Sequence, residues 1–449
     1  MYNVDSSPTV VGCRFERNYD SGMSNGRSSP TVIDCTFAQN ERGGMRNYES
    51  SPRVLGCAFL ENAGSGMVND SRGMVNGSHG DPIVRNCTFY RNTGINGGGM
   101  NNHGSDPLVV GCVFIGNGAT DSGAYGDGGA IFNHGSFPTI VNCIFNGNIS
   151  PTTGGAIANY LGGNPTIINC SFNGNTAAVS GGVMSNLSNP LRKCTCRPVM
   201  TNCILWGNST PKILDEEGAE TTITFSNVEG GWTGSGGNNI DVDPLFVDAP
   251  DGNLRLLPNS PCIDAGDNGS VPESVTTDLD GKPRVIDGNL DGTVIVDMGA
   301  YEFQPLTLDI DPGACPNVLN TQRSGPIKMA ILGTPAFEVW ELNLTSLALS
   351  RADGVGGTVQ PVQRGRGRGI RFKDVATPFS GAPCECHDLH GDGIVDRVLT
   401  FSVREMVNAF ELGALEPGMT VTLTLTGRLI DGTEFAASDC VVVNRRGRP

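Results

Sequence analysis

The sequence predicts an all-β protein with two parts: a right-handed parallel β-helix of about ten coils and a C-terminal β-sandwich. Three observations lead to this fold class. A short unit with proline, cysteine, phenylalanine and asparagine at fixed spacing recurs eight times, and glycine supplies 63 of the 449 residues without the period of collagen. Residues 306–449 change to longer alternating strands. We therefore expect repeats at 1–225, degenerate final coils with an acidic cap at 226–305, and a sandwich domain at 306–449.

Eight cysteines mark the repeat. Each follows a proline by five residues and precedes an asparagine by five, and seven of them have phenylalanine two residues later, with Leu205 in the eighth copy. The tightest period is 22 residues, which holds about three short strands. A unit this small cannot bury its apolar side alone, so equivalent strands of successive copies must stack in parallel. The cysteines are Cys13, Cys35, Cys57, Cys87, Cys112, Cys143, Cys170 and Cys203.

Stacking assigns these cysteines a structural role. Equivalent positions lie about 4.8 Å apart in neighbouring strands, so we expect an inward column of cysteines beside a column of phenylalanines. Parallel Cβ vectors disfavour disulfides between neighbours, and no histidine accompanies the column at ligand spacing. The residue before each cysteine is Gly, Asp or Asn, which suits a bend with positive φ.

Two short motifs alternate through the repeats. "FERN", "FAQN", "FLEN" and their later copies follow the cysteines, and "GGAI" occurs at 128–131 and 154–157. Over residues 7–208 this pattern resembles the repeat of chlamydial-type polymorphic outer membrane proteins, although early copies carry Ser-Gly-Met instead. The resemblance implies a right-handed parallel β-helix that is surface-exposed and adhesin-like.

The segment 226–305 is acidic, with 14 Asp and Glu against 3 Lys and Arg, and the acidity is local within a chain of net charge −16. Such a distribution argues against a general nucleic-acid binder. "NSPCIDAGDN" and "VDMGAYEF" resemble the closing segment of secreted bacterial β-helix proteins, so we expect this segment to cover the last coil. Its aspartates either bind calcium or cap turns. They are Asp264, Asp267, Asp278, Asp280, Asp287, Asp291 and Asp297.

Residues 306–449 alternate like strands, and only "VREMVNAFELG" has helical spacing. The stretches "CPNVLN", "AILGT", "CEC" and "SDCVVV" resemble a C-terminal module of secreted proteins from environmental bacteria, and no assigned activity comes with this likeness. An even number of cysteines predicts two disulfides with three connectivities. These cysteines are Cys315, Cys384, Cys386 and Cys440.

"DLHGDGIVD" resembles a dockerin-type calcium loop. Acidic and polar residues alternate around Gly393 as in an EF-hand, but Leu399 stands where the bidentate glutamate belongs. We predict calcium binding, with a turn stabilised by its own aspartates as the alternative. The predicted ligands are Asp388, His390, Asp392 and Asp396. A cramped zinc set is a weaker rival, formed by Cys384, Cys386, His387 and His390.

Three histidines recur near one repeat position, namely His79, His103 and His134. Stacking would align their imidazoles on consecutive coils, where they could bind a divalent transition metal. The plainer alternative is a polar turn facing solvent.

Polysaccharide lyases and hydrolases with this fold need clustered carboxylates and a base on one outer face. Between Arg91 and Arg192 the chain has no Lys or Arg, and its only acids there are Asp106, Asp121 and Asp127. We therefore predict a non-catalytic adhesin-like or structural protein that binds a glycan or a surface protein through its variable corners, including the insertion "GATDSGAYGD". A pectate-lyase-like enzyme is the alternative.

No run of 18 apolar residues predicts a membrane-spanning helix. No secretory leader follows Met1 either, and the first repeat begins almost at once. We expect an extracellular or cell-surface protein whose leader is missing from this sequence.

Overall fold

The computed structural model describes residues 1–71, 80–120, 128–188, 195–289, 293–334, 337–362, 371–377, 384, 390–430, 432 and 434–445. The chain forms two compact units. The first comprises Met1–Leu256, Ser260–Val285 and Ile295–Glu302, and the second comprises Leu257–Asn259, Ile286–Val294 and Phe303–Pro449. No helix among the described residues is long and apolar enough to span a membrane.

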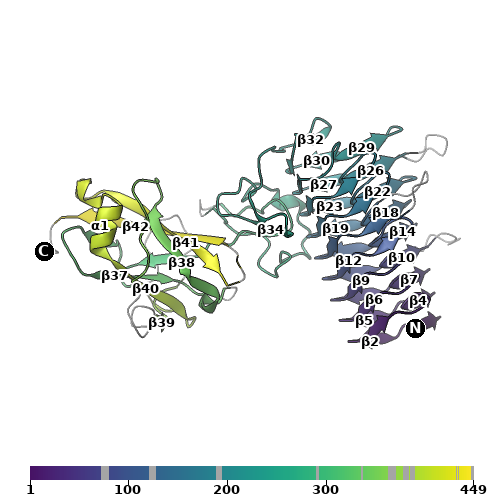
Figure 1. Ribbon diagram of the computed structural model, residues 1–449, viewed down its shortest axis with the longest axis horizontal. Helices are drawn as coiled ribbons and strands as arrows, with labels where there is room; N and C mark the ends of the chain where they lie inside the picture. The colour runs from purple at the N-terminus through teal and green to yellow at the C-terminus, as the bar shows by residue number, and fades with distance from the viewer. Residues whose placement is uncertain are drawn as a thin grey trace. The chain divides into compact units, whose positions relative to one another are not determined.

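The first unit is the predicted right-handed parallel β-helix, in which each coil adds one strand to each of three parallel sheets (Figure 1). Sheet A contains β1 (Tyr2–Val4), β4 (Met23–Gly26), β7 (Met45–Tyr48), β10 (Met67–Asp70), β14 (Met100–His103), β18 (Ile131–His134), β22 (Ile157–Tyr160), β26 (Met184–Leu187) and β29 (Ile213–Glu216). Sheet B contains β2 (Thr9–Val11), β5 (Thr31–Ile33), β8 (Arg53–Leu55), β11 (Ile83–Arg85), β15 (Leu108–Val110), β19 (Thr139–Val141), β23 (Thr166–Ile168), β27 (Val199–Thr201), β30 (Thr222–Thr224) and β32 (Ser235–Gly237).

Sheet C contains β3 (Arg14–Glu16), β6 (Thr36–Ala38), β9 (Ala58–Leu60), β12 (Thr88–Tyr90), β16 (Val113–Ile115), β20 (Ile144–Asn146), β24 (Ser171–Asn173), β28 (Ile204–Trp206) and β31 (Asn227–Val228). A short fourth parallel sheet follows it in the middle coils, formed by β13 (Thr93–Gly94), β17 (Gly118–Ala119), β21 (Ile149–Ser150) and β25 (Thr176–Ala177). The ten strands of sheet B agree with the expected number of coils.

The interior consists of columns of equivalent side chains. Seven phenylalanines stack face to face from Phe15 to Phe172, with neighbouring ring centroids 4.6–4.9 Å apart and ring planes within 7°. Trp232 packs against the apolar core at the last coil, and its Nε1 donates to the carbonyl of Ser235. The repeat therefore builds one continuous core, because each coil repeats the contacts of its neighbour.

Two buried ladders of asparagines run beside the rings. In the ladder from Asn18 to Asn208, each Nδ2 donates to Oδ1 of the next coil at 2.7–3.0 Å. A second ladder runs along sheet A from Asn3 to Asn186 and ends on the carboxylate of Asp215. Buried amides are costly without partners, so these ladders fix the register of the coils.

The predicted bends are confirmed. The residue before each cysteine has φ between 50° and 64° in all eight copies, whether it is Gly, Asp or Asn. Asparagine tolerates this left-handed conformation better than most residues, which is why it can replace glycine there.

We expected the acidic segment to cover the last coil, but most of it lies elsewhere. Residues 227–240 complete the final coils, but the following part, with β33 (Phe246–Asp248), β34 (Asn253–Leu256) and the short helix η2 (Asn268–Ser270), folds back along the flank of earlier coils. Val275 packs on the outer side of sheet B, against Val141 among others, and Tyr301 packs beside Ile144. The outward side chains of the middle coils are apolar there, so a second layer can bury them.

Three bend asparagines hold this layer by hydrogen bonds. Asn142 Nδ2 donates to the carbonyl of Thr277 at 2.7 Å, and Asn202 Nδ2 donates to that of Asp267 at 3.0 Å. Asn169 Nδ2 donates to the carbonyl of Asp297 at 3.2 Å. The bend position therefore serves both as a turn and as a docking point.

The second unit is a β-sandwich. One sheet has the order β35 (Leu308–Ile310), β37 (Pro326–Ile331), β40 (Asp396–Ser402), β39 (Arg371–Lys373), and the other has β36 (Val318–Asn320), β42 (Glu434–Asn444), β41 (Thr420–Leu429), β38 (Leu342–Arg351). The predicted helix is α1 (Val403–Ala409), and Ser402 caps it by accepting the N–H of Glu405. Two single turns, η3 (Val339–Glu341) and η4 (Leu412–Ala414), complete this unit.

Candidate functional site

The outer face of sheet A carries a row of polar and aromatic side chains, which we call the outer stripe: Tyr48, Asp70, His103, His134 and Tyr160. They occupy the last position of five consecutive strands, and the strand register places each beside the next. The alternation of β14 and its neighbours turns this position outward, while the ladder asparagine before it points inward. The stripe is therefore a direct product of stacking.

Rings lie close together along the stripe. The ring centroids of His103 and His134 are 5.3 Å apart, and those of His134 and Tyr160 are 5.4 Å apart. Tyr48 is 44% exposed, and the neighbouring carboxylate of Glu49 raises its pKa. Such a row offers aromatic surface, hydroxyls and imidazole nitrogens at one position per coil.

The structure brings His103 and His134 together, as the sequence predicted, whereas His79 lies outside the described residues. Within the described residues, no three His, Cys, Asp or Glu side chains converge as a metal site would require. Transition-metal binding by these histidines stays a prediction.

The structure places the cysteine column inside the rod. Seven of the eight cysteines are buried, while Cys13 is exposed at the first coil. Main-chain N–H groups donate to the sulfur of the next coil, as from Cys35 to Cys57 at 3.4 Å. Burial raises the pKa of Cys112, Cys143 and Cys170 well above the ordinary range. The reactive species of cysteine is the thiolate, so these thiols are inert filling rather than a chemical centre.

This difference predicts the pattern of thiol reactivity. Cys13→Ser should remove one fast-reacting equivalent from a titration of the native protein with a disulfide reagent. Cys112→Ser, the matched control in the buried column, should leave the number of fast equivalents unchanged. Loss of a fast equivalent in the control would show that the column is accessible.

The flanking layer contains a buried charged cluster. Arg284 and Glu302 are fully buried and lie 3.4 Å apart between Nη2 and Oε1, and Arg284 also donates to the carbonyls of Asp297 and Gly299. Asp278 accepts the N–H groups of Asp280, Lys282 and Glu302. These acids are used as internal acceptors, which supports the turn-capping alternative over calcium for Asp278.

The cluster predicts how stability depends on pH. Burial raises the pKa of Asp278, and it raises the pKa of Glu302 to about 10 from 4.5 although Arg284 opposes this. Because the folded state favours the protonated acids, the contribution of Glu302 is complete below about pH 4 and is lost as the pH rises toward about 10, and that of Asp278 is lost in the same direction. The melting temperature should therefore fall between these limits, and Glu302→Gln should flatten that slope. An unchanged slope in the variant would contradict this.

The predicted calcium loop is only partly described, because Asp388 lies outside the described residues. Gly393 has the expected positive φ of 92°, and Asp392 Oδ1 accepts the N–H of Ile394. Asp396 is buried and accepts N–H groups of Gly333, Val375 and Ala376. Asp396 therefore joins strands, and calcium binding by this loop stays a prediction.

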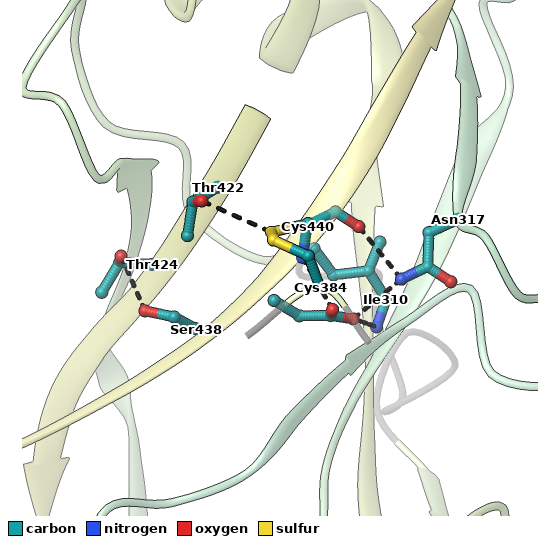
Figure 2. The surroundings of a disulfide bond; sticks show 8 residues. Ile310, Asn317, Cys384, Thr422, Thr424, Ser438 and Cys440 are labelled. Atoms are coloured by element: carbon teal, nitrogen blue, oxygen red, sulfur yellow. Dashed lines mark hydrogen bonds between the residues drawn. A yellow bond between two sulfur atoms is a disulfide. The ribbon is translucent and has the colours of Figure 1, made fainter. Parts of the chain in front are cut away.

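A disulfide joins Cys384 to Cys440 across 56 residues, with Cα atoms 4.8 Å apart (Figure 2). Cys315 is also disulfide-bonded, and no other described cysteine is its partner. Beside this bond, Asp439 Oδ2 accepts from Ile310 N and Asn317 Nδ2. Cys384 therefore has no thiolate to offer the rival zinc set, and Cys386 and His387 of that set lie outside the described residues.

The described acids on the middle coils accept hydrogen bonds from main-chain N–H groups, whereas Asp121 and Asp127 lie outside the described residues. Asp81 accepts the N–H of Asp106, and Asp106 accepts the N–H of Phe137, which extends a column begun by serines. At the last coil, a cavity of ≈ 450 Å³ beside Trp232 contains Lys212 and one carboxylate, Glu229, whose Oε2 lies 3.1 Å from Nζ. Neither place brings together two free carboxylates and a base.

No family model matches this chain, and no curated protein matches it. A structural search finds the crystal structure of pectate lyase Pel9A, with 15% identity, a TM-score of 0.35, and coverage of 65% of this chain and 70% of that one. Full-length QnrB1, a plasmid-mediated fluoroquinolone resistance protein, has 12% identity and a TM-score of 0.18 over 49% of this chain and 93% of that one. At these values neither likeness bears on function.

Proposed function

We propose that this protein is an extracellular or cell-surface binding protein that holds an extended glycan along the outer stripe and does not cleave it. The row of side chains on five consecutive coils of sheet A carries the proposal. A polymer that lies along the rod would meet the same kind of contact at every coil, so weak contacts would add along its length.

The chemistry of the stripe suits sugars. The C–H groups on the face of a pyranose are attracted to the negative face of an aromatic ring, and hydroxyls pair with imidazole, phenol and carboxylate groups. The insertion at 72–79 begins two residues after Asp70 in the sequence, and we propose that the variable corners border the ligand and select it. A surface protein is the other ligand class that such a face could bind.

Replacement of the stripe tests this proposal. His134→Ala and Tyr160→Ala should each weaken binding of the best ligand from a glycan array about tenfold, as expected for a central contact of an interface. Tyr19→Ala is the matched control, because Tyr19 is a 75% exposed aromatic outside the stripe. The proposal fails if stripe variants with unchanged melting temperature bind every ligand as the original protein does.

A further inference from the structure

Two large aromatic side chains meet on the surface of the second unit. Trp340 in η3 is 51% exposed and Phe372 in β39 is 45% exposed, yet their ring centroids lie only 4.0 Å apart with an interplanar angle of 40°. Single exposed apolar residues are ordinary, whereas two exposed rings in contact form a continuous aromatic surface. These rings come from separate segments that fold onto β40, so the pair belongs to a built surface rather than to one loop.

An arginine completes the surface. Arg397 is the cross-strand neighbour of Phe372 in the β39–β40 register, and its Cζ lies 3.9 Å from the centroid of the Phe372 ring. Over the described part of the chain no carboxylate lies within ion-pair distance of it, and its buried Nε has no hydrogen-bond partner. A guanidinium is a planar donor that matches carboxylates and sulfates, so this one lacks the partner for which its geometry is suited.

Local charge favours an anion in the same place. Arg371 and Lys373 flank Phe372 on the edge strand and are exposed, although the alternation of the strand turns them to its other face. They add positive potential near Arg397, which the carboxylate of Asp396, the cross-strand neighbour of Lys373, offsets in part. Glu341 follows Trp340, so the cationic end of the surface lies on the side of Phe372.

We propose that Trp340, Phe372 and Arg397 form a binding site for an acidic sugar unit of a polysaccharide. The exposed surface of the two rings would contact the C–H face of the pyranose, and Arg397, which lies over the Phe372 ring, would donate hydrogen bonds to the carboxylate or sulfate group of the sugar. This site goes beyond the outer stripe, because its residues lie in the other compact unit and it requires an anionic ligand. Each site can be present without the other.

The experiment uses the full chain in a His134→Ala/Tyr160→Ala background, so that the outer stripe does not contribute. Binding of polygalacturonate, dextran sulfate and neutral dextran is measured by calorimetry. Tryptophan fluorescence is followed in parallel, and comparison with Trp340→Ala isolates the signal of Trp340 from that of the other two tryptophans. Trp340→Ala and Arg397→Gln should each weaken binding of the anionic polymer about tenfold. Met419→Ala is the matched control, because Met419 is a 46% exposed apolar side chain of the same unit outside the surface.

Each outcome decides the proposal. Preference for polygalacturonate with loss in both variants supports the site and assigns a carboxylate, and the same losses with dextran sulfate alone assign a sulfate. Arg397→Lys keeps the charge, so partial retention of affinity shows that the loss in Arg397→Gln reflects binding rather than unfolding. The proposal is overturned if neither anionic polymer binds more tightly than dextran, or if the folded Trp340→Ala protein or the folded Arg397→Gln protein binds them like the parent.

Discussion

Replacing Phe114 by alanine should lower the free energy of unfolding of the rod by about 3–5 kcal/mol. The ring is fully buried and stacks between Phe89 at 4.7 Å and Phe145 at 4.9 Å. Gly99 lies against the same ring, and a Cβ added there would come within 2.8 Å of it. The neighbours are fixed by their own coils, so they cannot close the cavity that the shorter side chain leaves.

Denaturant unfolding measures this loss, and Phe15→Ala is the matched control at the open end of the same stack. Phe15 is only partly buried, so its truncation should cost less than half as much. Equal losses at the two positions would contradict the view that stacking from both sides supplies the stability.

The second large effect concerns the asparagine ladder. Asn117 Oδ1 accepts from the main-chain N and from Nδ2 of Asn92, and its own Nδ2 donates to Phe89 O and Asn148 Oδ1. Asn117→Leu keeps the branched shape of the side chain but leaves the main-chain N–H and the side-chain amide of Asn92 without their acceptor. An orphaned buried group and the lost bonds should together cost about 2–4 kcal/mol.

Asn18→Leu provides the comparison for the ladder. Asn18 lies at the exposed end and only donates to Asn40, so water can replace it, and the expected cost is below about 1 kcal/mol. If the two leucine variants unfold at the same denaturant concentration, the buried hydrogen bonds of the ladder do not stabilise the stacking of the coils.

Much of the rod could be predicted because each position repeats. When Cys, Phe or Asn recurs at one spacing, the stacked strands must place the equivalent residues of successive coils beside one another. The positive φ before each cysteine follows from the same argument and is confirmed from Gly12 to Asn202. The asparagines of the second ladder also recur in the sequence, after each Gly-Gly-apolar motif. Their recurrence alone does not show whether the amides point inward.

Contacts between distant segments could not be predicted in the same way. The hydrogen bond from Asn142 to Thr277 joins residues 135 positions apart, whereas the position of the acidic segment after the last repeat predicted a cover for the last coil. The acids of this segment instead make internal contacts. Asp278 accepts main-chain hydrogen bonds, and Asp280 forms an ion pair with Arg255 at 2.6 Å. Trp340 and Phe372 were missed for the same reason, because no periodicity links them.

Incubating the tightest-binding polysaccharide with the protein and following its chain length by size-exclusion chromatography tests the central claim most directly. We expect the polymer to bind the original protein and to bind the stripe variants more weakly. We also expect it to keep its full length after prolonged incubation with or without calcium. Progressive shortening that depends on the protein would contradict a non-catalytic binding role and favour the polysaccharide-cleaving alternative.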